Sequence, residues 1–312
     1  MADRGRKGVT AILRLLWSIG EHSPEIFFKL FDSQIQPILT YGSEIWGVST
    51  KQDCIERVHL SAMKRFLCVS QRTPKHLVYG ELGRYPLRIN TFVKCVKFWL
   101  RILCMDDSRY PKKAYNMLLF LQKQNYSTWA CNIRNLLYTY GYGVVWEAQA
   151  VGDIKSFIAA FKQRLIDNYA QDWHSALESH TFYGVYSTYS HSLILRPYFN
   201  VIKSINIRKI FTRFRLGMLP LRAHFLNFNN ANTSFNNSCP FCTNVPETEL
   251  HFLLTCPKYD HLRTQFISKK YYRQPSLFKL TLLMSSCNKT VILRVCIFVY
   301  KAYLVRMNAQ FE

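Results

Sequence analysis

The sequence has 312 residues, of which 49% are apolar and 15% aromatic, so it is long enough for about two domains and too apolar for a disordered chain. Its 41 Lys and Arg against 19 Asp and Glu give a formal net charge of +22. A basic surplus of this size in a folded chain favours a polyanionic partner. We expect this partner to be RNA or DNA, and not a membrane.

Ten cysteines are present, and seven of them lie outside one short cluster. These seven stand in apolar stretches typical of helices, where a free thiol acts as a small hydrophobic group: Cys54, Cys68, Cys95, Cys104, Cys131, Cys287 and Cys296. The first residues predict a polar leader into an amphipathic helix, because Arg14 interrupts the apolar stretch that a secretory signal would need. We therefore expect no disulfide framework and an intracellular location, in the nucleus, the cytoplasm or both.

Apolar residues recur at helical spacing in the first part of the chain. This periodicity predicts a helix over Ile26–Ile35 that ends at Pro37, and another over Ile55–Leu67. Glycines punctuate Tyr41–Gly47, which predicts a tight connection with Trp46 buried as its anchor.

A second turn rich in glycine and proline, Gly80–Pro86, leads into an apolar helix over Ile89–Met105. Helical signals are weaker from residue 108 to about residue 200, where we expect helices around Leu118–Gln122, Ile133–Tyr138 and Phe157–Trp173. The sequence therefore predicts a mainly α fold.

The most apolar segment, Val291–Met307, contains Arg294, Lys301 and Arg306. These charges make the segment a poor membrane span, so we expect a helix that packs onto the rest of the protein.

The stretch SCPFCTNVPETELHFLLTCPKYDHLR (Ser238–Arg263) holds the remaining three cysteines and a histidine. Their spacing is Cys239-x2-Cys242-x8-His251-x4-Cys256, and a two-residue gap is typical of a turn that presents two thiolates to one ion. Thiolate and imidazole are the ligands that zinc prefers, and four of them predict a closed, structural site. The alternative is three buried thiols beside a core histidine.

The residues between the second and third cysteine indicate a short helix. Glu247 and Glu249 suit its first turn, where carboxylates interact well with the helix dipole, and Pro257 ends it. His261 is an alternative ligand to His251, because it lies five residues beyond Cys256.

Basic residues flank this cluster on both sides and alternate with aromatic ones. A basic face with aromatic rings is typical of a surface that follows phosphates and stacks on bases, although a single lysine is more often just solvated. The candidate nucleic-acid-binding residues are Arg208, Lys209, Arg213, Arg215, Arg222, Lys258 and Arg263.

Several segments, in fixed order, resemble the region that follows the polymerase core in non-LTR (LINE-type) retrotransposon reverse transcriptases. They are LFDSQIQPILTYGSEIWG, IERVHLSAMKRFLCVSQRTPKHLVYGELGRYPLRI, and FRLGMLP followed by CPFC and ETELHFLLTCPKYDHLR. The resemblance covers about Ala11–Met105 and Asn206–Ile267 and is faint between them. It implies a thumb-like helical bundle over 1–107, and over 201–312 a basic helical linker with a CCHC zinc knuckle (239–256) and a C-terminal helix. Between them, the weak helical signals alone predict a poorly defined helical middle region over 108–200.

In that family the thumb cradles the template–primer duplex, and the linker and knuckle hold template RNA or target DNA. The resemblance assigns the metal role to Cys239, Cys242, His251 and Cys256. It assigns nucleic-acid binding to Arg213, Arg215 and Arg222. It implies structural roles for Tyr41, Glu44, Trp46, Gly80, Glu81, Gly83 and Pro86.

The polymerase signature of this family is a carboxylate pair in a β-hairpin that holds two Mg²⁺ ions. The only comparable pair, Asp106 and Asp107, follows a predicted helix and the thumb-like residues, so we interpret it as a polar helix end. No endonuclease is evident either. We therefore expect a non-catalytic fragment that binds RNA or DNA, with the retroelement ribonucleoprotein as a further partner. The alternatives are a zinc-stabilised protein-interaction scaffold, or a decayed retrotransposon copy without a selected function.

Overall fold

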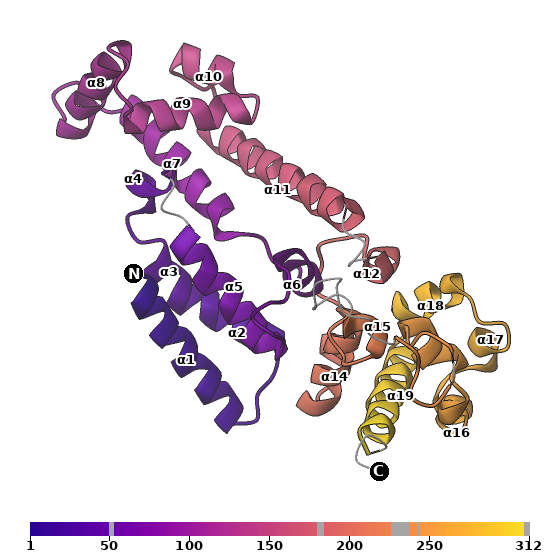
Figure 1. Ribbon diagram of the computed structural model, residues 1–312. Helices are drawn as coiled ribbons and strands as arrows, with labels where there is room; N and C mark the ends of the chain where they lie inside the picture. The colour runs from indigo at the N-terminus through magenta and orange to yellow at the C-terminus, as the bar shows by residue number, and fades with distance from the viewer. Residues whose placement is uncertain (50–52, 180–183, 226–236, 243, 309–312) are drawn as a thin grey trace. The chain divides into compact units, whose positions relative to one another are not determined.

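The computed structural model describes residues 1–49, 53–179, 184–225, 237–242 and 244–308 (Figure 1). These residues are mainly helical. Across the described ranges, extended backbone pairs only in isolated antiparallel bridges, Leu82 with Leu195 and Ser238 with Pro246. The predicted mainly α fold class is confirmed.

The chain divides into two compact units, each assembled from separate stretches of sequence. The first unit consists of Met1–Leu15, Phe28–Ala62 and Tyr85–Asp172, and the second of Leu16–Phe27, Met63–Arg84 and Trp173–Glu312. Neither unit coincides with one of the three contiguous regions expected from the sequence.

The helices up to the middle of the chain are α1 (Ala2–Ser18), α2 (Pro24–Leu30), α3 (Gln36–Leu39), α4 (Ser43–Trp46), α5 (Asp53–Leu67), α6 (Lys75–Leu82), α7 (Leu87–Leu103), α8 (Tyr110–Lys123), α9 (Trp129–Thr139), α10 (Gly143–Ala148) and α11 (Ile154–Ser179). They are followed by α12 (Gly184–Tyr189), α13 (Tyr198–Val201), α14 (Ile205–Arg215), α15 (Arg222–Phe225), α16 (Asp260–Phe266), α17 (Lys269–Tyr272), α18 (Leu277–Met284) and α19 (Lys289–Asn308). Shorter helical turns occupy Phe31–Ile35, His251–Thr255 and Pro257–Tyr259.

Helical periodicity predicted most of the long helices. Helix α5 buries Ile55, Val58 and Ala62, which recur three or four residues apart on one face. Helix α7 covers the predicted helix Ile89–Met105 except for its last two residues. Helices α8, α9 and α11 contain the three stretches predicted in the middle region, and α19 contains the predicted C-terminal helix.

The predicted end of a helix at Pro37 is wrong. A π-type turn, Phe31–Ile35, follows α2, and Pro37 lies in the first turn of α3, which continues to Leu39. The missing N–H of proline needs no partner at the start of a helix, so the helical path continues past Pro37.

The predicted amphipathic helix is present as α1, which begins at Ala2 and so includes the polar residues expected to precede it. Two glycines explain how this helix packs on α3 and the π-type turn before it. A Cβ on Gly5 would lie 2.4 Å from Leu39 Cδ2, and one on Gly8 would lie 2.5 Å from Ile35 Cδ1. A larger residue at either position would therefore require the Leu39 or the Ile35 side chain to shift.

Trp46 is partly buried and is not the buried anchor expected of the Tyr41–Gly47 turn. Its Nε1 donates to the carbonyl oxygen of Tyr41 at 2.9 Å. Ser43 and Gly47 are the buried residues, because α7 packs against this turn through Cys95, whose Sγ lies 3.1 Å from the Ser43 carbonyl oxygen.

An aromatic cluster fixes the helices that follow α7 in the first unit. The Trp99 ring of α7 stacks on Trp146 of α10 with ring centres 5.6 Å apart. Trp99 Nε1 donates to the Tyr115 hydroxyl at 2.9 Å, and this hydroxyl donates to Gln149 Oε1 at 2.6 Å. Residues from the middle region, where the helical signals of the sequence are weak, thus pack on the end of α7.

Among the described helices, none is by itself long and apolar enough to cross a bilayer. Helices α18 and α19 meet that criterion only as a pair, with a bend of 113° at the break between them.

Candidate metal centre and basic side chains

A closed turn presents the first two cysteines of the cluster. Ser238 and Pro246 form an antiparallel bridge, and the N–H of Cys239 donates to the Val245 carbonyl oxygen at 2.7 Å. Inside this loop, the N–H of Cys242 donates to the Cys239 carbonyl oxygen at 3.3 Å. Both thiols therefore emerge from one side of a short hydrogen-bonded loop.

The helical turn that carries the other two ligands has an unusual pitch. The Thr248 hydroxyl accepts a hydrogen bond from the N–H of His251 at 3.2 Å, which caps the start of the helical segment. The N–H of Cys256 then donates to the His251 carbonyl oxygen at 2.8 Å, five residues back. In an α-helix, residues five apart are rotated by about 140° from one another, whereas this wider turn brings them to one side.

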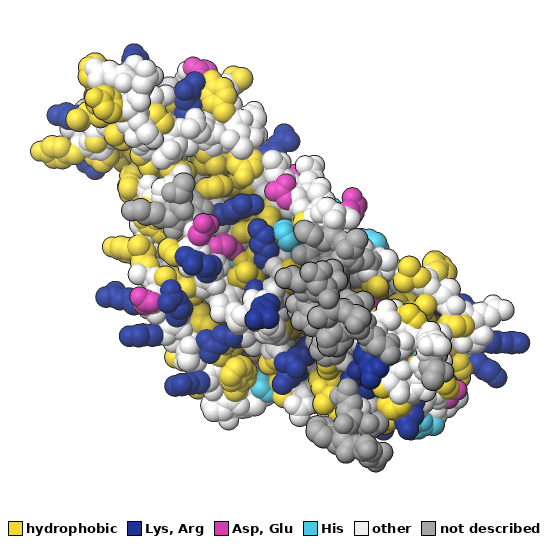
Figure 2. Space-filling model, viewed as in Figure 1, with side chains coloured by type: hydrophobic (Ala, Val, Ile, Leu, Met, Phe, Trp, Pro, Cys, Tyr) yellow, Lys and Arg dark blue, Asp and Glu magenta, His cyan; other side chains and the backbone are white. Residues whose placement is uncertain are grey.

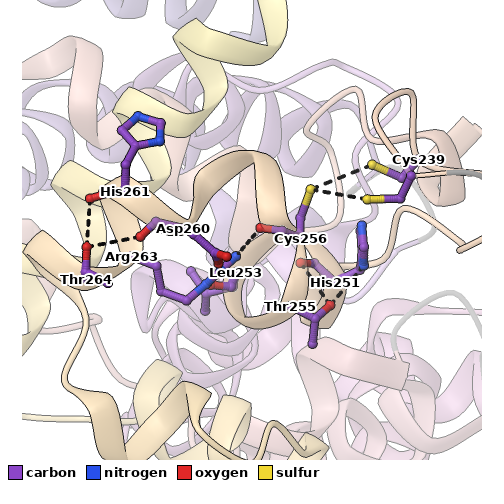
Figure 3. Close-up of polar contacts among 10 residues, drawn as sticks. Cys239, His251, Leu253, Thr255, Cys256, Asp260, His261, Arg263 and Thr264 are labelled. Atoms are coloured by element: carbon purple, nitrogen blue, oxygen red, sulfur yellow. Dashed lines mark hydrogen bonds and ion pairs between the residues drawn. The ribbon is translucent and has the colours of Figure 1, made fainter.

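The four candidate ligand atoms lie together. The Sγ atoms of Cys239, Cys242 and Cys256 and a ring nitrogen of His251 are all within 4.8 Å of one another. Cys256 Sγ is 3.9 Å from Cys239 Sγ and 3.8 Å from Cys242 Sγ (Figure 3). Sulfurs bound at about 2.3 Å to one tetrahedral zinc stand roughly 3.8 Å apart, so the spacing fits this ion.

The imidazole of His251 is oriented for metal binding. Its Nδ1 lies 2.9 Å from the Thr255 hydroxyl, and that hydroxyl also donates to the His251 carbonyl oxygen at 3.3 Å. Because the hydroxyl proton is used in this way, the hydroxyl oxygen accepts from Nδ1–H, and Nε2 keeps its lone pair. Nε2 is buried and has no hydrogen-bond partner, as expected of an atom that binds a metal ion.

Burial acts on the protonation of Cys239, Cys256 and His251. It raises the pKa of the Cys239 and Cys256 thiols and lowers the pKa of His251, which favours neutral side chains in the absence of a cation. Zinc binds thiolates and neutral imidazole, so metal binding here must release protons from the cysteines.

His261, the alternative ligand, is exposed and is not one of the four clustered residues. Figure 3 shows its ring directed away from Cys256 and Cys239. Among the described residues, His251 is therefore the histidine that completes the cluster.

The predicted place of Glu247 in the first helical turn is wrong, because this residue lies before the helical segment. Its side chain is buried, and its carboxylate accepts hydrogen bonds from Nε and Nη2 of Arg306 at 2.6 and 2.9 Å. It also accepts the N–H of Arg222 at 2.7 Å. A carboxylate in this interior needs such partners, and they connect the segment that follows Cys242 to α15 and α19.

Three of the candidate nucleic-acid-binding arginines are buried: Arg208, Arg215 and Arg263. The guanidinium of Arg263 donates to the carbonyl oxygens of Leu253 at 3.1 Å and Cys256 at 2.8 Å, and it also pairs with Asp260. It thus braces the backbone at the last cysteine of the cluster (Figure 3).

The other two buried arginines act in the body of the second unit. Arg215 Nε lies 2.6 Å from Glu81 Oε1, and the guanidinium of Arg208 lies over the rings of Phe66 and Phe199 at 5.5 and 5.7 Å. These guanidinium groups already have partners within the chain.

Two further candidates are partly buried and use backbone acceptors. Arg213 donates through Nε and Nη2 to the Cys68 carbonyl oxygen at 3.0 and 2.9 Å, just beyond the end of α5. Arg222 Nη1 donates to the Ser238 carbonyl oxygen at 3.1 Å. Arg213 therefore stabilises the backbone just beyond the end of α5, and Arg222 stabilises the backbone next to Cys239.

The remaining two candidates are more accessible. Lys209 is partly buried and Lys258 is exposed, with Lys258 Nζ 5.2 Å from the centre of the Phe241 ring in the knuckle loop. Lys269, Lys270 and Arg273 are exposed a short distance along the chain. Across the visible face, Lys and Arg are spread widely and Asp and Glu are sparse (Figure 2).

Asp106 and Asp107 follow the end of α7 in an exposed turn, as predicted. Asp106 Oδ1 accepts the N–H of Ser108 at 2.8 Å, and hydrogen bonds from the side chain and the N–H of Ser108 lower the pKa of Asp106. The described residues around the pair form helices and not the β-hairpin that a polymerase carboxylate pair requires.

Comparisons of the chain with protein-family models, with curated proteins and with solved structures find no match.

Proposed function

We propose that the chain is a zinc-stapled, non-catalytic nucleic-acid-binding protein that resembles the C-terminal part of a LINE-type reverse transcriptase. The observation that carries this proposal is the cluster of three cysteine Sγ atoms and a ring nitrogen of His251, all within 4.8 Å of one another. The donor set of three sulfurs and one nitrogen is typical of structural zinc, and the ion would hold the knuckle loop against its helical turn.

The proposed binding surface consists of exposed basic side chains next to the knuckle. Lys258 follows the last ligand by two residues, and Lys269, Lys270 and Arg273 extend the positive charge along the same segment. Lys258 lies over the Phe241 ring, which packs edge to face with Tyr259 at a distance of 5.9 Å between ring centres. Such side chains neutralise phosphates and release counterions, which makes binding strongly salt-dependent.

The first test is anisotropy titration of labelled single-stranded RNA, single-stranded DNA and duplex DNA over a range of salt concentrations. We expect the logarithm of the affinity to fall by about 0.7–0.9 per phosphate contact for each tenfold rise in salt. Absence of binding to all three at about 50 mM salt, where such contacts are strong, would rule out the proposal.

A matched pair of triple variants locates the surface. Replacing Lys258, Lys269 and Lys270 by alanine should reduce the salt slope by roughly 2 to 3, at about one contact per lysine. The control removes three exposed lysines from the first unit, Lys7, Lys29 and Lys123, and should leave the slope almost unchanged. Equal reductions of the salt slope in the two variants would mean that binding depends on the total charge of the chain and not on this surface.

One observation favours the alternative of a zinc-stabilised interaction scaffold. The burial of Arg208, Arg215 and Arg263 removes three predicted phosphate contacts from the surface. A scaffold would keep its metal ion and its fold but bind nucleic acid weakly at all salt concentrations, and the titration above separates the two functions.

A further inference from the structure

A cavity of about 200 Å³ lies in the second unit, and none of its lining residues belongs to the cysteine cluster. Its walls come from the end of α12, the segment that leads to α13, helix α14 and the junction of α18 with α19. Apolar and aromatic side chains supply much of the lining, among them Tyr198, Phe211, Leu283, Ile292 and Val295.

Two buried arginines, Arg196 and Arg215, also line this cavity, with exposed fractions of 6% and 4%. They share one carboxylate, that of Glu81, which is completely buried. Arg215 Nε lies 2.6 Å from Glu81 Oε1, and Arg196 Nε lies 3.8 Å from Glu81 Oε2. This trio therefore carries one more positive charge than negative charge.

The second carboxylate in this neighbourhood does not enter the cavity. Glu249 acts electrostatically on Tyr189, which lines the cavity, but Glu249 is not itself one of the lining residues. The excess charge of the trio thus faces the cavity without a carboxylate of the lining to balance it.

The hydrogen bonds of the two arginines differ. Arg215 is well satisfied, because it donates through Nε to Glu81 and through Nη1 to the Met284 carbonyl oxygen at 2.8 Å. Arg196 donates through Nη2 to the Ser192 carbonyl oxygen at 2.7 Å, but its buried Nε has no hydrogen-bond partner. An unsatisfied donor on a buried cation is costly, and it lies beside a cavity large enough for a ligand.

We propose that this cavity binds a small monocarboxylate with a flat apolar body. A single negative charge balances the excess of the arginine–glutamate trio, whereas a dianionic phosphate would overcompensate it. Guanidinium groups bind carboxylates well, and the aromatic walls suit a planar ring. A cavity of about 150 Å³ holds benzene, so this one has room for a ring that bears a carboxylate.

The cavity provides its own reporter, because the exposed thiol of Cys287 is one of its lining residues. The experiment treats the full chain with iodoacetamide in the presence of benzoate and measures the modification of each cysteine by mass spectrometry. The exposed Cys104 in the first unit serves as the internal control. Benzamide, which has the same shape without the charge, serves as the matched ligand control.

We expect benzoate to slow the alkylation of Cys287 at least fivefold, in a saturable manner, and to leave Cys104 unaffected. Benzamide should give less than a tenth of the affinity. Equal shielding by the two compounds, or none by benzoate, would overturn the proposal. Shielding by inorganic phosphate as strong as that by benzoate would also overturn it, because the apolar walls would then contribute nothing.

A pair of variants at the exposed residue Ile194, which also lines the cavity, tests the role of charge without changing the buried arginines. Ile194→Glu should weaken the benzoate-dependent shielding about tenfold, whereas Ile194→Gln should change it less than about twofold, as expected for a charge close to the binding site. Identical shielding in the two variants would contradict a site that selects anions. This proposal goes beyond the nucleic-acid-binding function, and neither outcome depends on binding of RNA or DNA.

Discussion

Glu247 and Arg306 form a bidentate ion pair with distances of 2.6 and 2.9 Å, although each side chain is only 1% exposed. The pair joins the end of the knuckle loop to the last helix, α19. A buried pair of this kind depends on both partners, because either charge left alone would be unpaired in the interior.

Replacing Glu247 by glutamine should lower the free energy of unfolding by about 3–5 kcal/mol, because it leaves Arg306 charged and buried. Urea unfolding followed by circular dichroism measures this loss. The control is Asp3→Asn, which breaks the exposed Asp3–Arg6 pair and should cost less than about 1 kcal/mol. Similar losses in both variants would show that the Glu247–Arg306 pair contributes little.

Thr255 sets the orientation of the His251 ring, so Thr255→Val should weaken zinc binding. Loss of a hydrogen bond to a metal-bound histidine typically lowers metal affinity about 10- to 100-fold. Competition with a chromophoric chelator measures the affinity. Thr264→Val is the matched control, because the Thr264 hydroxyl binds only the backbone of Asp260 and His261, and unchanged affinity in Thr255→Val would contradict the assigned role of Thr255.

The spacing of ligands in the sequence predicted the members of the cluster, because a two-residue gap and a following helix are local features. It did not predict the wide turn between His251 and Cys256, which places both ligands on one side. A gap of four residues between histidine and cysteine within a helical stretch is the only local signal for such a turn.

The sequence was less informative about arginines. Positions such as Arg208 and Arg215 flank an apolar stripe on α14, and this pattern is typical of solvated residues at the edge of a helix. Their burial depends on partners far along the chain, Phe66 for Arg208 and Glu81 for Arg215, which periodicity cannot reveal. The formation of a helix depends on nearby residues in the sequence, whereas these side-chain contacts depend on the tertiary structure.

We expect Arg213 to stabilise the fold and not to bind nucleic acid. It donates two hydrogen bonds to the carbonyl oxygen of Cys68, whose backbone has a left-handed φ of 56° at the end of α5. Arg213→Gln should therefore lower the free energy of unfolding by about 1–3 kcal/mol and leave the salt slope of nucleic-acid binding unchanged. Arg273→Gln, at an exposed position, should reduce the salt slope and leave the free energy of unfolding unchanged. A reduced salt slope in Arg213→Gln without a loss of stability would contradict the structural role of Arg213.

Cys95 should make the free energy of unfolding decrease as the pH rises into the alkaline range. Burial and the nearby carboxylate of Glu44 raise the pKa of the Cys95 thiol to about 12, whereas an unfolded thiol titrates at about 8.5. The folded state therefore favours the neutral thiol. The stabilisation of the folded state by this thiol is complete below about pH 8.5, and it is lost as the pH rises toward 12, at up to about 1.4 kcal/mol per pH unit.

The comparison of wild type with Cys95→Ala isolates this effect. The difference in unfolding free energy between them should narrow between pH 9 and pH 11 by up to about 1.4 kcal/mol per unit. In the folded protein at pH 8, iodoacetamide should modify the exposed Cys104 and spare Cys95. A stability difference that stays constant over this pH range would disprove the prediction.

We propose that one zinc ion joins Cys239, Cys242, His251 and Cys256. X-ray absorption at the zinc edge, combined with metal analysis of the purified chain, determines whether this ion is present and which atoms bind it. We predict one zinc per chain with three sulfur ligands at about 2.3 Å and one nitrogen ligand at about 2.0–2.1 Å. A folded protein that retains no zinc after incubation with the metal, or a spectrum dominated by oxygen ligands, would contradict the account.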